Sequence, residues 1–166
     1  MGSKRGQMQI PFGMIFSILL IIAFVAVAIY AIIMIVGWGK CASTGIFKED
    51  LQLKIDEAWN SDEHIETFSG TLPSNLEFVC FIDIAMPGRG AYKDFYEKFE
   101  KYGFVNMNLF FYPISETCEG QQGFDIKHID LEKITEDQNP YCIENTEGKV
   151  SVRIEKGFGD ALVKVS

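Results

Sequence analysis

The 166-residue chain has few of the residues from which catalytic and metal sites are built. It contains two histidines, His64 and His128, and neither has a partner at the spacing of a metal site or a catalytic triad. There is no G-x-S-x-G motif, and Gly88-Arg89-Gly90 lacks the Lys-Ser/Thr pair of a P-loop and the full spacing of G-x-G-x-x-G. We therefore expect no catalytic, cofactor-binding or metal-binding residue, and a protein that is not an enzyme.

Carboxylates are the remaining source of acid–base chemistry. Asp83, Asp125 and Asp130 are the candidates for a paired general acid and base, but no spacing in the sequence places them together. His64 falls in the acidic, loop-like stretch SDEHIE, and His128 falls in an expected strand. Each of these residues is therefore expected to be an ordinary structural or surface residue.

Basic residues are also scarce, which limits the partners. The chain has 15 Lys and Arg against 23 Asp and Glu, for a net charge of −8. Without Lys4, Arg5 and Lys40, the part from Cys41 onward keeps 12 basic and all 23 acidic residues, and so carries −11. Such a surface repels phosphate backbones and anionic lipid head groups. Nucleic acid is therefore excluded as an expected partner.

Charge is entirely absent from Gly6 to Gly39. Between Ile10 and Trp38 the chain reads IPFGMIFSILLIIAFVAVAIYAIIMIVGW, which exceeds the roughly 20 apolar residues that span a bilayer. Backbone polar groups in lipid must be satisfied internally, so this run must be helical. The alternative, a cleaved secretory signal, would have an apolar stretch of about 7–15 residues and a clear A-x-A site. We expect a retained helix over residues 10–38 and a lipid bilayer as a partner.

The flanking charges predict the orientation of this helix. Lys4 and Arg5 precede it, whereas Lys40 follows it and is soon joined by Glu49 and Asp50. By the positive-inside rule, residues 1–9 are expected in the cytoplasm and the C-terminal domain outside the cell membrane.

The cysteines agree with an oxidising compartment, since all four follow the apolar run. We expect disulfides, with Cys118–Cys142 first because both residues flank an irregular stretch, and Cys41–Cys80 second. Four free buried thiols are the alternative. A zinc site is disfavoured, because the chain has no C-x-x-C.

The remainder predicts one extracytoplasmic α+β domain over residues 47–166. Gly37, Gly39 and Gly45 predict a linker over residues 39–46.

Apolar residues four apart predict a helix over 47–59 with the stripe Phe47, Leu51, Ile55 and Trp59. A second helix is expected over 91–102, ended by Gly103. Strands are expected over 76–84, 104–112 and 124–131, with a hairpin of 149–156 and 161–165 at the end. The expected fold is an antiparallel sheet of about four to six strands carrying two helices.

The N-terminal junction resembles a known signal. Lys4-Arg5-Gly6-Gln7-Met8 before a long apolar helix is similar to the class III signal of archaeal type IV pilins and archaellins. The resemblance implies cleavage between Gly6 and Gln7 on the cytoplasmic side and a helix that packs into a filament core. Pro11 stands at the fifth position after that cut, where bacterial pilins carry Glu, and the three glycines interrupt what pilins often keep as one long helix.

The whole chain also resembles an uncharacterised family of small archaeal single-pass membrane proteins. The resemblance lies in RGQMQIPFGMIFS, LQLKIDEAW, LEFVCFID, NPYCI and KVSVRIEKGFGDALVKV. It implies a topology and an origin, but no reaction.

Three functions remain open at this point. The first is a membrane-anchored structural or interaction subunit that assembles with itself or with other surface proteins, as in a pilin-like cell-surface filament. The alternatives are a monomeric tethered binding module and a tethered enzyme. For helix-driven assembly, the small residues of the apolar run are the expected packing positions, namely Gly13, Ala23, Ala26, Ala28 and Ala31.

Overall fold

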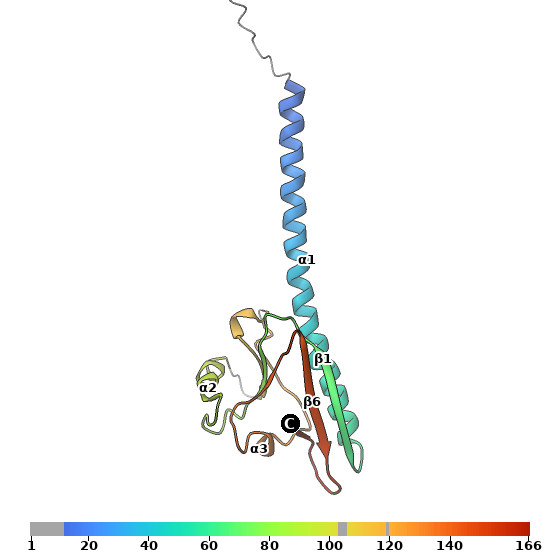
Figure 1. Ribbon diagram of the computed structural model, residues 1–166, viewed down its shortest axis with the longest axis vertical. Helices are drawn as coiled ribbons and strands as arrows, with labels where there is room; N and C mark the ends of the chain where they lie inside the picture. Colours follow the sequence, from blue (N-terminus) through green and yellow to red (C-terminus); the bar gives the residue numbers. More distant parts are fainter. Residues whose placement is uncertain (1–11, 103–105, 119) are drawn as a thin grey trace, which may run out of the picture. The chain divides into compact units, whose positions relative to one another are not determined.

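The computed structural model describes residues 12–102, 106–118 and 120–166. Two compact units divide the chain, residues 1–38 and 39–166. Helix α1 runs from Phe12 to Trp59 and contributes to both. Figure 1 shows the ribbon with its labelled elements. In the first unit, every side chain from Gly13 to Ile35 is exposed.

The predicted linker over residues 39–46 is wrong, because α1 passes through it as a helix. Each helical glycine costs about 1 kcal/mol relative to alanine, so Gly39 and Gly45 weaken this segment but do not end it. Neighbouring side chains hold the segment on the second unit: Cys41 forms a disulfide with Cys118, and the Thr44 hydroxyl donates to Gln121 Oε1 at 2.6 Å. These contacts offset the glycines.

The second unit is an α+β domain, as predicted, but its strands form two sheets rather than one. The first sheet has the order β1-β6-β7, and the second has the order β4-β3-β2-β5. All pairs in both sheets are antiparallel. The strands are β1 His64–Thr71, β2 Phe78–Phe81, β3 Leu109–Tyr112, β4 Gly123–Phe124, β5 Tyr141–Glu144, β6 Lys149–Lys156 and β7 Lys164–Val165. The short helices are α2 Lys93–Glu100, η1 Ile114–Glu116 and α3 Leu131–Ile134.

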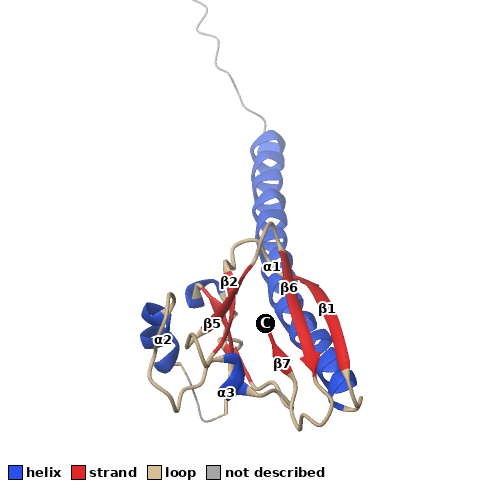
Figure 2. Cartoon of the chain, turned by 60° about the horizontal axis from the view of Figure 1, so that its bottom comes forward, coloured by secondary structure: helices blue, strands red, loops and turns tan. Residues whose placement is uncertain are grey.

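The second half of α1 covers the first sheet (Figure 2). Phe47, Leu51 and Ile55 are buried, as their four-residue spacing predicted. Trp59 was expected on the same stripe but is 38% exposed, and Ala58 is buried in its place. The buried stripe therefore continues into the last turn of the helix through Ala58 and not through Trp59.

The terminal hairpin is confirmed. In β6 the residues Val150, Val152 and Ile154 are fully buried and alternate with exposed ones, and Ile154 pairs with Val165 of β7. The long partner of β6 is nevertheless β1, which pairs with it from His64 to Thr71. The loop-like interpretation of the stretch around His64 is therefore wrong.

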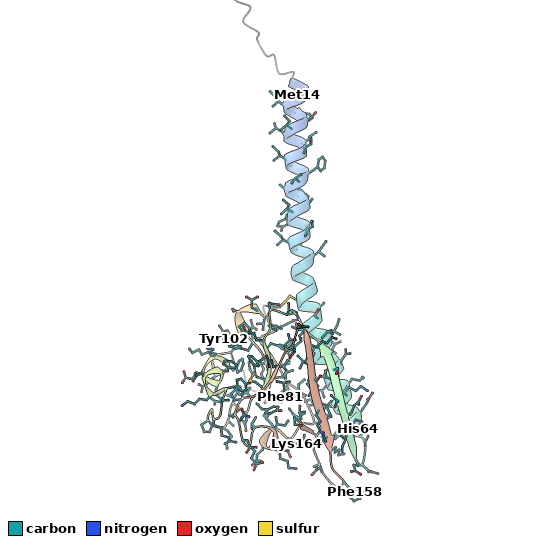
Figure 3. The ribbon with its side chains drawn as sticks, in the orientation of Figure 1. Met14, His64, Phe81, Tyr102, Phe158 and Lys164 are labelled. Atoms are coloured by element: carbon teal, nitrogen blue, oxygen red, sulfur yellow. A yellow bond between two sulfur atoms is a disulfide. The ribbon has the colours of Figure 1, made fainter. Side chains whose placement is uncertain are left out.

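A second core lies on the other side of the second sheet. Val79 and Phe81 of β2 enter the first core, whereas Cys80 enters the second with Phe99 of α2 and Phe110 of β3. Figure 3 labels Phe81 in the interior of this unit. Strand β2, which lies within the strand expected over 76–84, is therefore buried on both faces and is a central strand of its sheet. The strand expected over 124–131 is reduced to β4.

Candidate interaction surfaces

The apolar half of α1 is the largest unpaired surface among the described residues. Residues Gly13–Ile35 form a helical segment of 23 residues with the length and apolar composition of a membrane span. At 1.5 Å per residue the segment is about 35 Å long, slightly more than a hydrocarbon layer of about 30 Å. From Met14 onward, the side chains of this segment project on all sides of the helix (Figure 3).

The small residues predicted for helix packing all lie on this exposed segment. Their alanines do not form one stripe, because Ala26 and Ala28 are two residues apart and lie on opposite sides of a helix. Ala23 with Ala26, and Ala28 with Ala31, are three apart and form two separate small patches. The cleavage junction at Gly6 and Gln7 lies outside the described residues.

Two disulfides are present, but in the other pairing. Cys41 bonds to Cys118 with a Cα–Cα distance of 5.6 Å, and Cys80 bonds to Cys142 at 4.0 Å. The predicted pairs Cys118–Cys142 and Cys41–Cys80 are therefore wrong. Cys80 and Cys142 are direct partners in the register of β2 and β5, and β5 was not predicted. Cys41 reaches Cys118 because the helix continues through residues 39–46.

His128 has a carboxylate partner and an aromatic one. Its Nδ1 lies 2.9 Å from Asp56 Oδ1, and its ring stacks on Trp59 with centroids 3.8 Å apart and an angle of 4°. A general base also needs a substrate or a nucleophile within reach. No hydroxyl or thiol of the described segments hydrogen-bonds the ring, and the cluster lies at the surface. Its evident effect is to fasten the end of α1 to the loop before α3.

Two further hydrogen bonds also hold the end of α1 to loops of the domain. Gln52 accepts a hydrogen bond from the backbone N–H of Lys127 at 2.8 Å, and Trp59 Nε1 donates to the carbonyl of Ala161 at 3.1 Å.

His64, the other histidine, begins β1 and lies 3.3 Å from Glu66 Oε2. The hydrogen bonds that Lys54 donates to the carboxylates of Glu57 and Glu66 raise the pKa of Lys54, so its ammonium stays charged beside them.

The candidate carboxylates are only partly brought together. Asp83 and Asp125 line one open hollow of about 590 Å³, which His128 and Asp130 do not line. Asp125 is paired with Lys127, and Asp83 Oδ1 accepts from the N–H of Ala85 at 2.9 Å. Asp130 instead caps α3 by accepting from Lys133 N–H at 3.1 Å. Among the residues that the structure describes, no group of three or more His, Cys, Asp or Glu side chains is arranged to hold a metal ion.

Comparison with known proteins gave no match, either to a family model, to a curated protein or to a solved structure.

Proposed function

We propose that the protein is a membrane-anchored structural subunit that assembles through its apolar helix, in the manner of an archaeal type IV pilin. The observation that carries this proposal is the exposure of every side chain from Gly13 to Ile35. Apolar side chains exposed around the whole circumference need lipid or neighbouring helices around them. In this proposal the segment first resides in the bilayer and then packs against copies of itself.

The continuity of α1 supports the pilin-like form of the proposal. The glycines at 37, 39 and 45 had argued against one long helix, but α1 runs from Phe12 to Trp59 without interruption. Its second half is buried on a sheet through Phe47, Leu51 and Ile55, while its first half has no such cover. One helix thus supplies both a domain core and an uncovered apolar rod.

The proposed topology follows the charges and the disulfides. Lys4 and Arg5 ahead of the apolar run support a cytoplasmic N-terminus. Two disulfides in residues 39–166 suit an oxidising exterior. In this proposal the domain acts by contact with itself or with other surface proteins, and not by turnover of a substrate.

The first test is the mass of the mature protein from its native membrane. Removal of the first six residues, with Gln7 as the new N-terminus, supports a subunit processed like a pilin. A chain that retains residues 1–6 contradicts the pilin-like proposal and leaves a plain single-pass anchor.

The second test perturbs the helix on both sides. Ala26→Phe with Ala28→Phe adds bulk to two opposite sides of the rod, and self-association in detergent should weaken about tenfold or more because the small contacts are lost. Val25→Leu with Val27→Leu is the matched control, since it adds little bulk in the same turns. Unchanged association of the phenylalanine variant, measured by sedimentation, contradicts helix-driven assembly.

A further inference from the structure

An apolar side chain protrudes from the β6–β7 loop. Phe158 is 87% exposed, more than any other large hydrophobic residue of the described segments. Trp59 at the end of α1 and Leu162 of the same loop are 38% and 40% exposed. Trp59 belongs to this surface because its Nε1 donates to the carbonyl of Ala161 in the same loop. We call residues 59–63 and 157–162 the tip.

Hydrogen bonds hold the tip in one conformation. The N–H of Asp160 donates to the Gly157 carbonyl at 3.0 Å, and the N–H of Gly157 donates to Asp160 Oδ2 at 3.1 Å. Lys156 Nζ donates to the carbonyls of Trp59 and Ser61 at 2.6 and 2.7 Å. A surface that is ordered before contact loses less conformational entropy when a partner binds. The exposed phenyl ring of Phe158 therefore lies on a loop that is already ordered before a partner binds.

An ion pair adds to this order. Lys133 Nζ lies 3.4 Å from Asp160 Oδ1. The hydrogen bond to Asp130 and the negative charge of Asp160 raise the pKa of Lys133, so the lysine remains charged at neutral pH.

A hollow of about 300 Å³ lies elsewhere on the same unit, between the end of α2 and η1. Its size is at the lower end of the range for ligand pockets, which suits one or two protein side chains. Lys98 Nζ donates to the Tyr112 hydroxyl at 2.8 Å and lies 4.8 Å from the centre of that ring. Tyr102 is 46% exposed on the rim. The lining residues are Lys98, Lys101, Tyr102, Tyr112, Pro113, Ile114 and Ser115.

The tip and the hollow are complementary in charge and in chemistry. The tip carries three exposed carboxylates, Asp62, Glu63 and Asp160, against the two ammonium groups of Lys156 and Lys133, which leaves one negative charge in excess. The hollow has an apolar and aromatic wall, and both of its charged lining residues, Lys98 and Lys101, are basic. On a part of the chain that carries −11, such a basic hollow is where an acidic surface can approach without repulsion.

We infer that the tip of one copy docks in the hollow of a second copy, with Phe158 against Tyr102 and Tyr112. This inference rests on the proposed function and adds the contact between domains that accompanies helix packing. Figure 3 places Phe158 and Tyr102 at well-separated points of the unit. The contact is therefore heterologous, and each copy offers one tip and one hollow. A heterologous contact that does not close into a ring extends into a chain.

The test uses the full chain in detergent, with sizes measured by sedimentation velocity. Phe158→Ala removes the protruding ring, and Lys101→Glu reverses a charge of the hollow that forms no hydrogen bond with the described residues. Each variant alone should associate about tenfold more weakly, since apolar burial or charge complementarity is lost. Mixed in equal amounts they should associate more strongly than either variant alone, because one variant keeps a working tip and the other a working hollow. Ile65→Ala, which removes another exposed apolar side chain, is the control and should assemble normally.

Charge reversal gives an independent arm. Glu63→Lys combined with Lys101→Glu in one chain should restore the association lost by Lys101→Glu alone. Wild-type association of Phe158→Ala, or an equal loss in Ile65→Ala, overturns the inference. If Phe158→Ala has no effect while the Ala26 and Ala28 variant dissociates, only the docking contact is wrong and the helix-driven assembly stands.

Discussion

At the scale of single residues, a few side chains decide where the domain begins. Cys41 and Thr44 are three residues apart on α1 and therefore share one face. Cys41 is bonded to Cys118, and Thr44 contacts Gln121. Both contacts join the helix to one short segment after η1. The disulfide and the hydroxyl thus fix residues that the glycines alone would leave weakly helical.

The disulfide pairing gives the residue-scale prediction. Non-reducing peptide mapping should recover Cys41 linked to Cys118, and Cys80 linked to Cys142. The first bond joins residues 77 apart, and loop-closure entropy alone assigns it about 4 kcal/mol of stability. Replacing Cys41 and Cys118 with Ser should lower the free energy of unfolding by roughly this amount in denaturant titrations. Recovery of Cys118–Cys142 or Cys41–Cys80 peptides would contradict the pairing.

At the scale of elements, the helices and strands with periodic apolar residues were predicted well, and those without such a pattern were predicted poorly. The stripe Phe47, Leu51 and Ile55 and the alternation of β6 each contain enough apolar repeats to indicate their own burial. Strand β1 was missed because Phe68 is its only buried side chain, so its sequence HIETFSGT shows no alternation. Its structure depends on pairing with β6, which lies about 85 residues later in the chain. Sequence pattern carries no signal for such a long-range partner.

The pairing of the disulfides could not be predicted for the same reason. Cys142 lies in β5, a strand of four residues of which none is fully buried. Its partner Cys80 becomes evident only from the register between β2 and β5. The tip likewise combines residues distant in sequence, 59–63 and 157–162.

The helical glycines give the element-scale prediction. A Cβ added at Gly39 or Gly45 would meet nothing within 4 Å. Changing both to Ala should therefore stabilise the domain by about 1–2 kcal/mol, seen as a higher Tm. Gly70→Ala is the opposite case, since its Cβ would lie 2.4 Å from the Phe47 ring, and it should lower the Tm. A destabilised double variant would mean that residues 39–46 are not helical in solution.

At the scale of the whole molecule, two opposing forces would act on the proposed assembly. The helix exposes apolar surface that favours association, while every copy adds eleven net negative charges from residues 41–166. Like charges on neighbouring copies destabilise a compact assembly. The inferred attraction between tip and hollow would be local, whereas the repulsion would act between whole domains over longer distances.

Ionic strength separates these two terms. The Debye length falls from about 30 Å at 0.01 M salt to about 8 Å at 0.15 M, so long-range repulsion is screened before contacts at the interface are. Self-association of the full chain, followed by sedimentation at fixed detergent concentration, should therefore strengthen across this range. Sucrose at matched osmolality is the control, because it does not screen charge. If association instead weakens steadily with added salt, attractive ion pairs and not helix packing hold the copies together. The repulsion between domains is then weaker than their net charge of −11 implies.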